Sequence, residues 1–198
     1  MRLNPVPNDA NGAAALAARR STPSRLLGTP GPDRNALLRM LEAAVRVPDH
    51  GRRVPFRFIT IQGDARHRLG EELERIARER DPDAPAAVLE KDRQRFSHAP
   101  LVVAVVAVLD PEDEKIPAQE RLLSAGCVCF SLLVAAQSEG FGAQWLTGWP
   151  SYDEQVLARL GLSADERIAG FIHIGTASGE VPERERPDPE ALLSDWQP

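Results

Sequence analysis

The segment from Leu122 to Ala136 constrains the fold most, because it is apolar on nearly every side of the helix that it predicts. A helix without a polar face has to be buried, either at the centre of a domain or in a contact between subunits. We expect this helix to run from about Pro117 to Glu139. Gly140 is placed to end it, because glycine readily adopts the left-handed conformation that follows many helices.

Strands are expected where aliphatic, aromatic and β-branched residues concentrate, at residues 56–62, 101–109, 143–146 and 167–175. The second of these stretches is almost continuously aliphatic, which predicts a strand buried on both faces. Strands and long helices follow one another without a regular alternation. This order is typical of an α+β domain.

Further helices are expected from capping residues and hydrophobic periodicity. One begins after Asp33 and buries Leu37, Leu41, Ala44 and Val45. The next is long and charged, and it turns its apolar residues inward at Leu69, Leu73 and Ile76. Ser151 and Glu154 have the spacing of a capping box. The expected helices are residues 13–20, Asp33 to about Val47, a helix from Asp64, residues 85–97, and Ser151 to about Gly161.

The composition suits a single domain over residues 13–198, after a flexible arm at residues 1–12 and including an extended tail at residues 177–198. The chain has 198 residues, 42% of them hydrophobic, and a net charge of −5. Basic residues are interleaved with acidic ones, which argues against a nucleic-acid partner. No apolar run approaches the roughly 18 residues of a membrane span, so we expect no membrane partner and a cytoplasmic protein.

Common catalytic motifs are absent. The chain has no G-x-S-x-G elbow, no phosphate-binding loop and no Gly-rich dinucleotide fingerprint. The histidines lack metal-ligand spacing, and Cys127 and Cys129 would face opposite sides of a helix, so they can neither pair nor share a metal. We expect both thiols in the core and no metal site. If the protein is an enzyme, a cofactor carries its chemistry.

Arg19-Arg20-Ser21 is the first candidate site. Two guanidinium groups and a hydroxyl are the donors that a phosphate binds. The same arginines could instead complement the dipole at the end of a helix.

The other candidates are also open to two interpretations. Arg46 lies in the last expected turn of its helix, where it could bind a ligand or complement the helix dipole. His50 lies in a Pro-Asp-His-Gly turn. Asp49 could orient its imidazole there, or His50 could be an ordinary surface residue. Trp145 is either a ring beside free backbone amides or a core residue. Gly175-Thr176 is either a ligand contact or a plain turn. Arg184 and Arg186 read as solvated charges.

Taken together, these segments resemble the nitroreductase family, and in particular its small, single-domain bacterial branch. The resemblance runs in order from Leu16 to Pro187. It rests on Arg19-Arg20-Ser21, on Arg46-x-Pro48-Asp49-His50 followed by Pro55-Phe56-Arg57-Phe58, on Ser124-Ala125-Gly126, on Ala143-x-Trp145-x-Thr147-Gly148, and on Gly170-Phe171-Ile172-x-Ile174-Gly175-Thr176.

The resemblance implies a mostly antiparallel central sheet flanked by helices and an obligate homodimer with the long apolar helix at its interface. It implies one FMN at each of two interface sites, with NADH or NADPH as reductant and nitroaromatics, quinones or related small molecules as acceptors. No protein residue is expected to be catalytic, because FMN carries the hydride chemistry.

Residue by residue, the resemblance implies cofactor contacts from four parts of the chain. Arg19, Arg20 and Ser21 would hold the phosphate and flavin edge, and Arg46 and His50 would reach the FMN from the partner chain. The ring would lie against Trp145, Leu146 and Thr147, with Gly175, Thr176 and Ala177 near the phosphate. The segment linked with the nicotinamide nucleotide comprises Ala135, Ala136, Gln137, Ser138, Glu139 and Gly140.

This chain departs from the family pattern at three positions. Ala177 stands where the last motif usually has proline, and Phe56 where many members have tryptophan. Pro23 follows the first motif where many larger members place a lysine near the ring, which leaves open which cation faces the pyrimidine edge of the flavin.

The sequence leaves two questions open: what the tail packs against, and which activity the protein has. The tail is rich in Pro and Glu until Leu192, Leu193 and Trp196, so we expect it to dock on a partner subunit. The reading as a reductase competes with a relative that fragments or dehalogenates using flavin, with a non-enzymatic FMN-binding or sensing module, and with a plain interaction domain.

Overall fold

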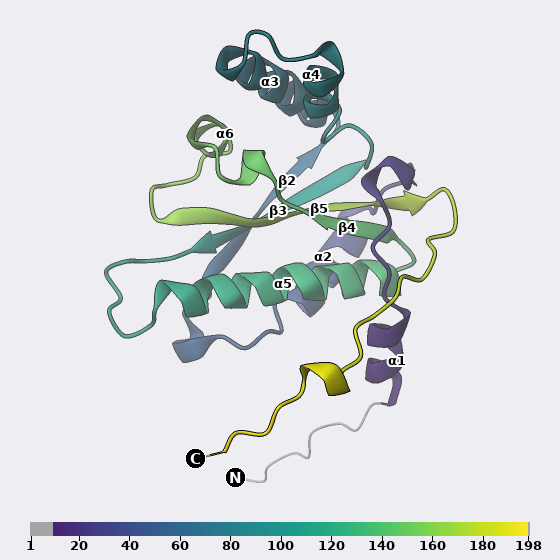
Figure 1. The fold of residues 1–198 in the computed structure, drawn as a ribbon, viewed down its shortest axis with the longest axis vertical. Coiled ribbons are helices and arrows are strands. Elements are labelled where there is room, and N and C mark those ends of the chain that lie inside the picture. Colours follow the sequence, from purple (N-terminus) through teal and green to yellow (C-terminus); the bar gives the residue numbers. More distant parts are fainter. Residues whose placement is uncertain (1–9, 198) are drawn as a thin grey trace.

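A five-stranded antiparallel sheet forms the centre of the computed structural model, which describes residues 10–197 (Figure 1). Strand β5 (Glu166–Ala177) pairs with β3 (Leu101–Val108), and β3 pairs with β2 (Phe56–Gln62). The short strands β4 (Gly142–Leu146) and β1 (Leu27–Gly28) also pair with β5. The α+β architecture and the antiparallel sheet confirm the sequence expectation.

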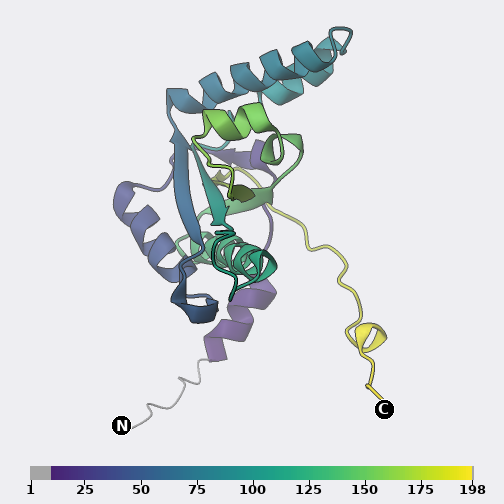
Figure 2. The same cartoon turned by 90° about the vertical axis from the view of Figure 1, so that its left-hand side faces the viewer.

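Strand β3 is buried on both faces because helices cover the sheet on both sides (Figures 1 and 2). On one face, α5 (Ala118–Ser138) packs beside α2 (Arg34–Ala44), with Met40 and Leu132 in the core between them and the sheet. The other core contains Leu73, Ile76 and Phe96. It lies under α3 (Asp64–Arg80), α4 (Ala86–Arg93) and α6 (Glu154–Arg159).

Several helix ends differ from the expected ones. Helix α1 (Ala10–Ala18) begins within the expected arm, while residues 1–9 lie outside the described part of the chain. Helix α2 begins after Asp33, whose carboxylate accepts from the Ala36 amide as expected, but it ends at Ala44. Pro48 disfavours the helical conformation at the residue before it, so the chain leaves the helix earlier. Arg46 therefore lies beyond the helix rather than in its last turn.

Helix α6 has a different cap from the one expected. Asp153, not Ser151, is the N-cap, and its Oδ1 accepts a 2.9 Å hydrogen bond from the Val156 amide. Ser151 instead ends a 3-10 turn and is buried. The expected capping box is wrong because the helix begins at Glu154, too late for Ser151 to reach its first amides. Helix α4 is also shorter than the expected residues 85–97.

Helix α5 ends as expected but is only partly buried. Gly140 has φ +84° and follows its last turn, and Phe141 N donates to Ala136 O as in a Schellman motif. Cys129 is buried, and burial raises the pKa of its thiol to about 12. Cys127 is exposed, so the expectation of two core thiols is wrong for this residue, because it lies on the outer face of the helix.

The outer face of α5 is apolar. Leu122, Leu123 and Phe130 are 43%, 60% and 41% exposed. Within residues 10–197, α5 is the one helix long and apolar enough by composition to cross a membrane, although no such segment was expected. Its inner face packs on β3, β4 and β5, which makes it a core helix with an uncovered apolar side.

The tail leaves the sheet after β5 and extends away from it (Figures 1 and 2). It contains one short 3-10 turn, Glu190–Leu192. Leu192, Leu193 and Trp196 are 73%, 78% and 85% exposed. The apolar end of the tail is thus uncovered by the described part of its own chain.

Candidate functional site

The turn after α1 carries the first predicted site. The Nη1 atom of Arg19 donates to Ser21 Oγ at 3.1 Å, so the hydroxyl and the guanidinium lie together. The Arg20 amide donates to Gln137 Oε1 at 2.9 Å, and Gln137 Nε2 returns a 3.0 Å hydrogen bond to Ala18 O. One glutamine of α5 therefore clamps this turn at both ends.

The tail brings two more arginines, Arg184 and Arg186, near this turn, and both are exposed to solvent, as expected. Glu183 forms ion pairs with both Arg20 and Arg186. Burial lowers the pKa of Arg19, and repulsion from Arg186, Arg184 and Arg20 lowers it further. We call Arg19, Arg20, Arg184 and Arg186 the arginine cluster. The sequence named Arg184 and Arg186 but left open whether they approach Arg19, because the two halves of the cluster meet only when the tail folds back.

The Trp145 ring has a fixed place at the edge of the sheet. Its Nε1 donates to Ala169 O at 3.2 Å, where a register shift in β5 turns that carbonyl outward. A Cβ atom at Gly170 would lie only 2.0 Å from Trp145 Nε1, so the ring packs directly on the glycine backbone. The ring remains 36% exposed. Trp145 is therefore a fixed surface ring and not a core residue.

The end of β5 joins the motifs at the two ends of the chain. Gly175 lies so close to Pro100 and Gly28 that a Cβ atom there would be 2.6 Å from Pro100 Cδ. Thr176 Oγ1 donates to Pro30 O at 2.7 Å, and Ala177 pairs with Leu27 of β1. These residues hold the segment that follows Ser21 against the sheet.

The turn that carries His50 is strained and held by its neighbours. Arg52 and Val54 have φ values of +53° and +49°, which β-branched residues such as valine rarely adopt. The Asp49 carboxylate accepts from the Arg53 and Val54 amides at 2.9 and 2.8 Å. Asp49 thus holds the turn. One interpretation of the sequence had expected it to orient the imidazole of His50, and it does not.

Helix α5 supplies the partners of this turn instead. Glu120 Oε2 lies 2.7 Å from His50 Nδ1, and Ser124 Oγ donates to Pro48 O at 2.9 Å. These contacts explain why Ser124 is present in the helix. They leave the Nε2 side of an exposed imidazole open. Arg46, one turn before, is also exposed.

The structure does not bring all of the predicted site residues together within one chain. His50 contacts Glu120 near the start of α5, whereas Arg20 contacts Gln137 near its end. With a rise of 1.5 Å per residue, these two positions are about 25 Å apart along the helix. Within one subunit, His50 and the Arg19–Ser21 turn therefore contact opposite ends of α5.

The segment expected near the nicotinamide nucleotide is occupied by structural contacts. Ala135 and Ala136 are buried in the core, and Gln137 clamps the turn after α1. Ser138 Oγ donates to Val134 O within the helix, Glu139 forms a bidentate ion pair with Arg39, and Gly140 ends the helix. Its role toward a nucleotide stays a prediction.

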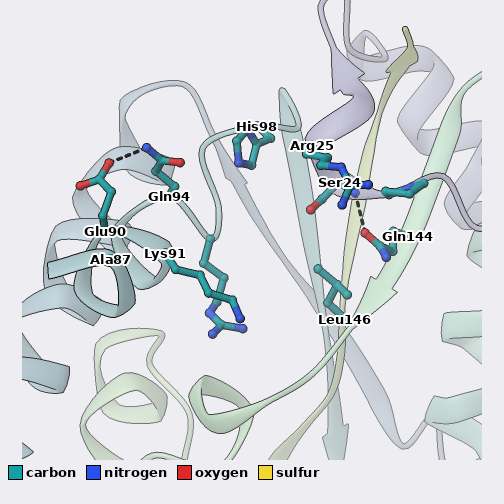
Figure 3. A pocket seen from close by; sticks show the side chains of 11 residues that line it. Ser24, Arg25, Ala87, Glu90, Lys91, Gln94, His98, Gln144 and Leu146 are labelled. Carbon is teal, nitrogen blue, oxygen red and sulfur yellow. Dashed lines mark hydrogen bonds between the residues drawn. The ribbon is translucent and has the colours of Figure 1, made fainter. Parts of the chain in front are cut away.

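A groove of about 600 Å³ opens beside Leu146, between β4, α4 and the 3-10 turn Ser24–Leu26 (Figure 3). The Gln144 side chain accepts from the Ser24 amide at 2.5 Å and joins two of these walls. The lining residues are Pro23, Ser24, Arg25, Ala87, Glu90, Lys91, Gln94, Arg95, His98, Gln144 and Leu146.

Sequence reasoning left the basic side of this groove unassigned. Lys91, Arg95 and His98 have the spacing of one helical face, which could have suggested a common direction. Arg95 is held by Asp92, a buried carboxylate that also accepts from Trp149 Nε1 at 3.0 Å. The spacing alone did not show that this face turns toward β4.

Comparisons with known proteins agree on one family. The model of the nitroreductase family matches residues 16–176. A Haemophilus influenzae protein provisionally named an NAD(P)H nitroreductase is 34% identical over 86% of this chain and 90% of its own.

Two solved structures have the same fold. A nitroreductase-like family protein from Bacillus cereus has a TM-score of 0.78 at 20% identity, covering 96% of this chain and 98% of its own. A structure described as a nitroreductase in complex with FMN, from Desulfovibrio desulfuricans, has a TM-score of 0.73 at 21% identity. That match covers 96% of this chain and all of the other, 100%.

Proposed function

The chain belongs to the nitroreductase family, and we propose that it is a cytoplasmic, homodimeric, FMN-dependent NAD(P)H oxidoreductase. Its acceptors would be nitroaromatics, quinones or related small molecules. The observation that carries the proposal is the arginine cluster, which gathers beside Ser21 at the edge of a sheet that also presents a fixed tryptophan ring.

The arginine cluster fits the phosphate of FMN. Four guanidinium groups lie close enough for mutual repulsion to lower the pKa of Arg19, and Glu183 compensates only part of this charge. A phosphate dianion would relieve the repulsion through charge-assisted hydrogen bonds. Arg19 and Ser21 are already oriented together by their own contact. The tail thereby gains a role in closing the phosphate site.

The edge of β4 and the adjacent groove fit the flavin ring. Trp145 supplies a flat surface on one face of β4, and Leu146, the next residue, lines the groove on the other face. Pro23 cannot donate a hydrogen bond, so Lys91 and Arg95 on the opposite wall would supply the cation at the pyrimidine edge. When bound, FMN supplies the hydride chemistry, and the protein binds, orients and polarises the ring.

Two observations support the homodimer: His50 and the arginine cluster contact opposite ends of α5, and the outer face of α5 is apolar and uncovered. Arg46 and His50 would complete the site of the other subunit, since His50 and Arg20 contact positions on α5 that are about 25 Å apart along the helix. The outer face of α5, with Leu122, Leu123 and Phe130, would lie at the contact. The apolar end of the tail would dock on the partner, and the segment Ala135–Gly140 would lie near the nicotinamide.

Absorbance of the purified protein tests the cofactor assignment, because bound FMN gives the protein a yellow colour. Steady-state oxidation of NADH and NADPH, with a nitroaromatic or a quinone as acceptor, then tests the activity. We expect full flavin occupancy and acceptor-dependent oxidation. A colourless protein that takes up no added FMN would refute the cofactor assignment. A yellow protein without turnover would indicate a flavin-binding module instead.

A further inference from the structure

The groove beside Leu146 carries an excess of positive charge in a protein whose net charge is negative. Three permanent cations, Arg25, Lys91 and Arg95, line it against a single acidic residue, Glu90. The Glu90 carboxylate is already engaged by the side-chain amide of Gln94. The groove is therefore suited to an anion.

The cations of the groove differ in whether they already form an ion pair. Arg95 is paired with the buried Asp92. Within residues 10–197, neither Arg25 nor Lys91 forms an ion pair, and His98 forms none either. The charges of Arg25 and Lys91 therefore remain available to a bound molecule.

Figure 3 shows two ends in this groove. The Lys91 side chain extends from α4 across the groove toward the wall that carries Leu146, the side that we propose faces the flavin. In this view, Arg25 and His98 both lie on the side of the groove where Ser24 is, away from Leu146. The second end is thus built from two different segments, residues 24–26 and the loop after α4.

We propose that the end of the groove formed by Arg25 and His98 binds an anionic group of the substrate, and that Arg25 determines this specificity. The anion would be a carboxylate on the acceptor or a phosphate on the nicotinamide nucleotide, since both offer the oxygens that a guanidinium group binds. His98 donates a ring N–H to the same oxygens. The inference rests on the proposed function, because the flavin would place the rest of the substrate beside Leu146.

Binding of unreactive molecules tests the inference without relying on turnover. Calorimetry on the FMN-loaded protein compares benzoate with benzamide, which differ in charge but hardly in shape, and NADP⁺ with NAD⁺. We expect the anionic member of at least one pair to bind about tenfold tighter, as for a charge-assisted hydrogen bond. Added salt should weaken that member selectively.

The substitution Arg25→Gln should abolish the preference and leave the neutral ligand unchanged. Arg34→Gln is the matched control, because Arg34 is an exposed arginine on α2, across the sheet, and its loss changes the net charge equally. A lost benzoate preference identifies an acceptor carboxylate, and a lost NADP⁺ preference identifies the reductant.

Three results would overturn the inference. The first is that the protein binds both members of each ligand pair equally well. The second is that Arg34→Gln has the same effect as Arg25→Gln. The third is that Arg25→Gln reduces the flavin content measured by absorbance. The last result would place Arg25 in the flavin site itself. Failure of the proposed function is a separate observation, namely that the wild-type protein binds no FMN.

Discussion

Gly170 shows how a single missing side chain can place an aromatic ring. A Cβ atom at this position would lie 2.0 Å from Trp145 Nε1, so Gly170→Ala must displace the ring or the strand. We expect a loss of about 1–3 kcal/mol in the free energy of unfolding, as for other overpacked sites, together with weaker FMN binding. Chemical denaturation and flavin absorbance measure the two effects. Gly28→Ala is the control, because the space around Gly28 is open, and an equal effect there would contradict the steric argument.

His173 is a second residue whose environment has a measurable consequence. It is 1% exposed, neither ring nitrogen has a partner among the described residues, and its ring stacks on Phe96. Burial, with nearby His98 and Arg95, lowers its pKa from 6.5 to about 4. The unfolded chain therefore binds a proton that the folded chain rejects, so stability falls as the pH drops from about 6.5 to about 4.

The size of this loss follows from the shift, at roughly 3 kcal/mol. We expect the difference in unfolding free energy between wild type and His173→Leu to change by about this amount between pH 7 and pH 4. The hydrogen bond with Arg57 lowers the pKa of Glu166 from 4.5 to about 2, so its contribution to stability is lost as the pH falls from about 4.5 to about 2. Glu166 is present in both proteins, so this loss cancels in the difference between them. A difference that is independent of pH would refute the buried neutral histidine.

At the scale of elements, α5 connects the core to the candidate site. Gln137 clamps the turn that carries Arg19–Ser21, although the family resemblance linked this segment with the nicotinamide nucleotide. We expect Gln137→Ala to weaken FMN binding by about tenfold, since two hydrogen bonds that position the turn are lost. Ser138→Ala, which removes a hydrogen bond within the helix, should leave it unchanged. If Gln137→Ala instead raises only the KM for NAD(P)H, its role is toward the reductant.

The sequence predicted elements better than it predicted their contacts. Strand β2 follows from its aromatic and β-branched residues, the inward residues of α3 from local periodicity, and the cap at Asp33 from local capping chemistry. The prediction that Ser151 caps α6 was wrong because two nearby residues, Ser151 and Asp153, can both cap a helix, and only the folded chain selects between them. The arginine cluster and the groove depend on segments far apart in the sequence. Neither periodicity nor capping contains that information.

At the scale of the molecule, the uncovered face of α5 predicts association. Obligate interfaces commonly bury more than about 2,000 Å² and are apolar at their centre. We expect a dimer by light scattering at micromolar concentration, and a monomer with little FMN for Leu123→Glu, because a charge would be buried in the contact. Tyr152→Glu is the control, since Tyr152 is 72% exposed on the other side of the sheet. A wild-type monomer would refute the proposed dimer.

The separation of His50 and Arg19 along α5 predicts how defective subunits complement each other. If each FMN is held by Arg19 of one subunit and His50 of the other, Arg19→Ala and His50→Ala homodimers both have two damaged sites. A heterodimer of the two variants places both lesions in one site and leaves the other intact. Mixing them should restore up to about half of the wild-type FMN content, because separate sites act independently. If verified subunit exchange restores no flavin, both residues act within one chain, which the roughly 25 Å between them along α5 would not permit without a large rearrangement.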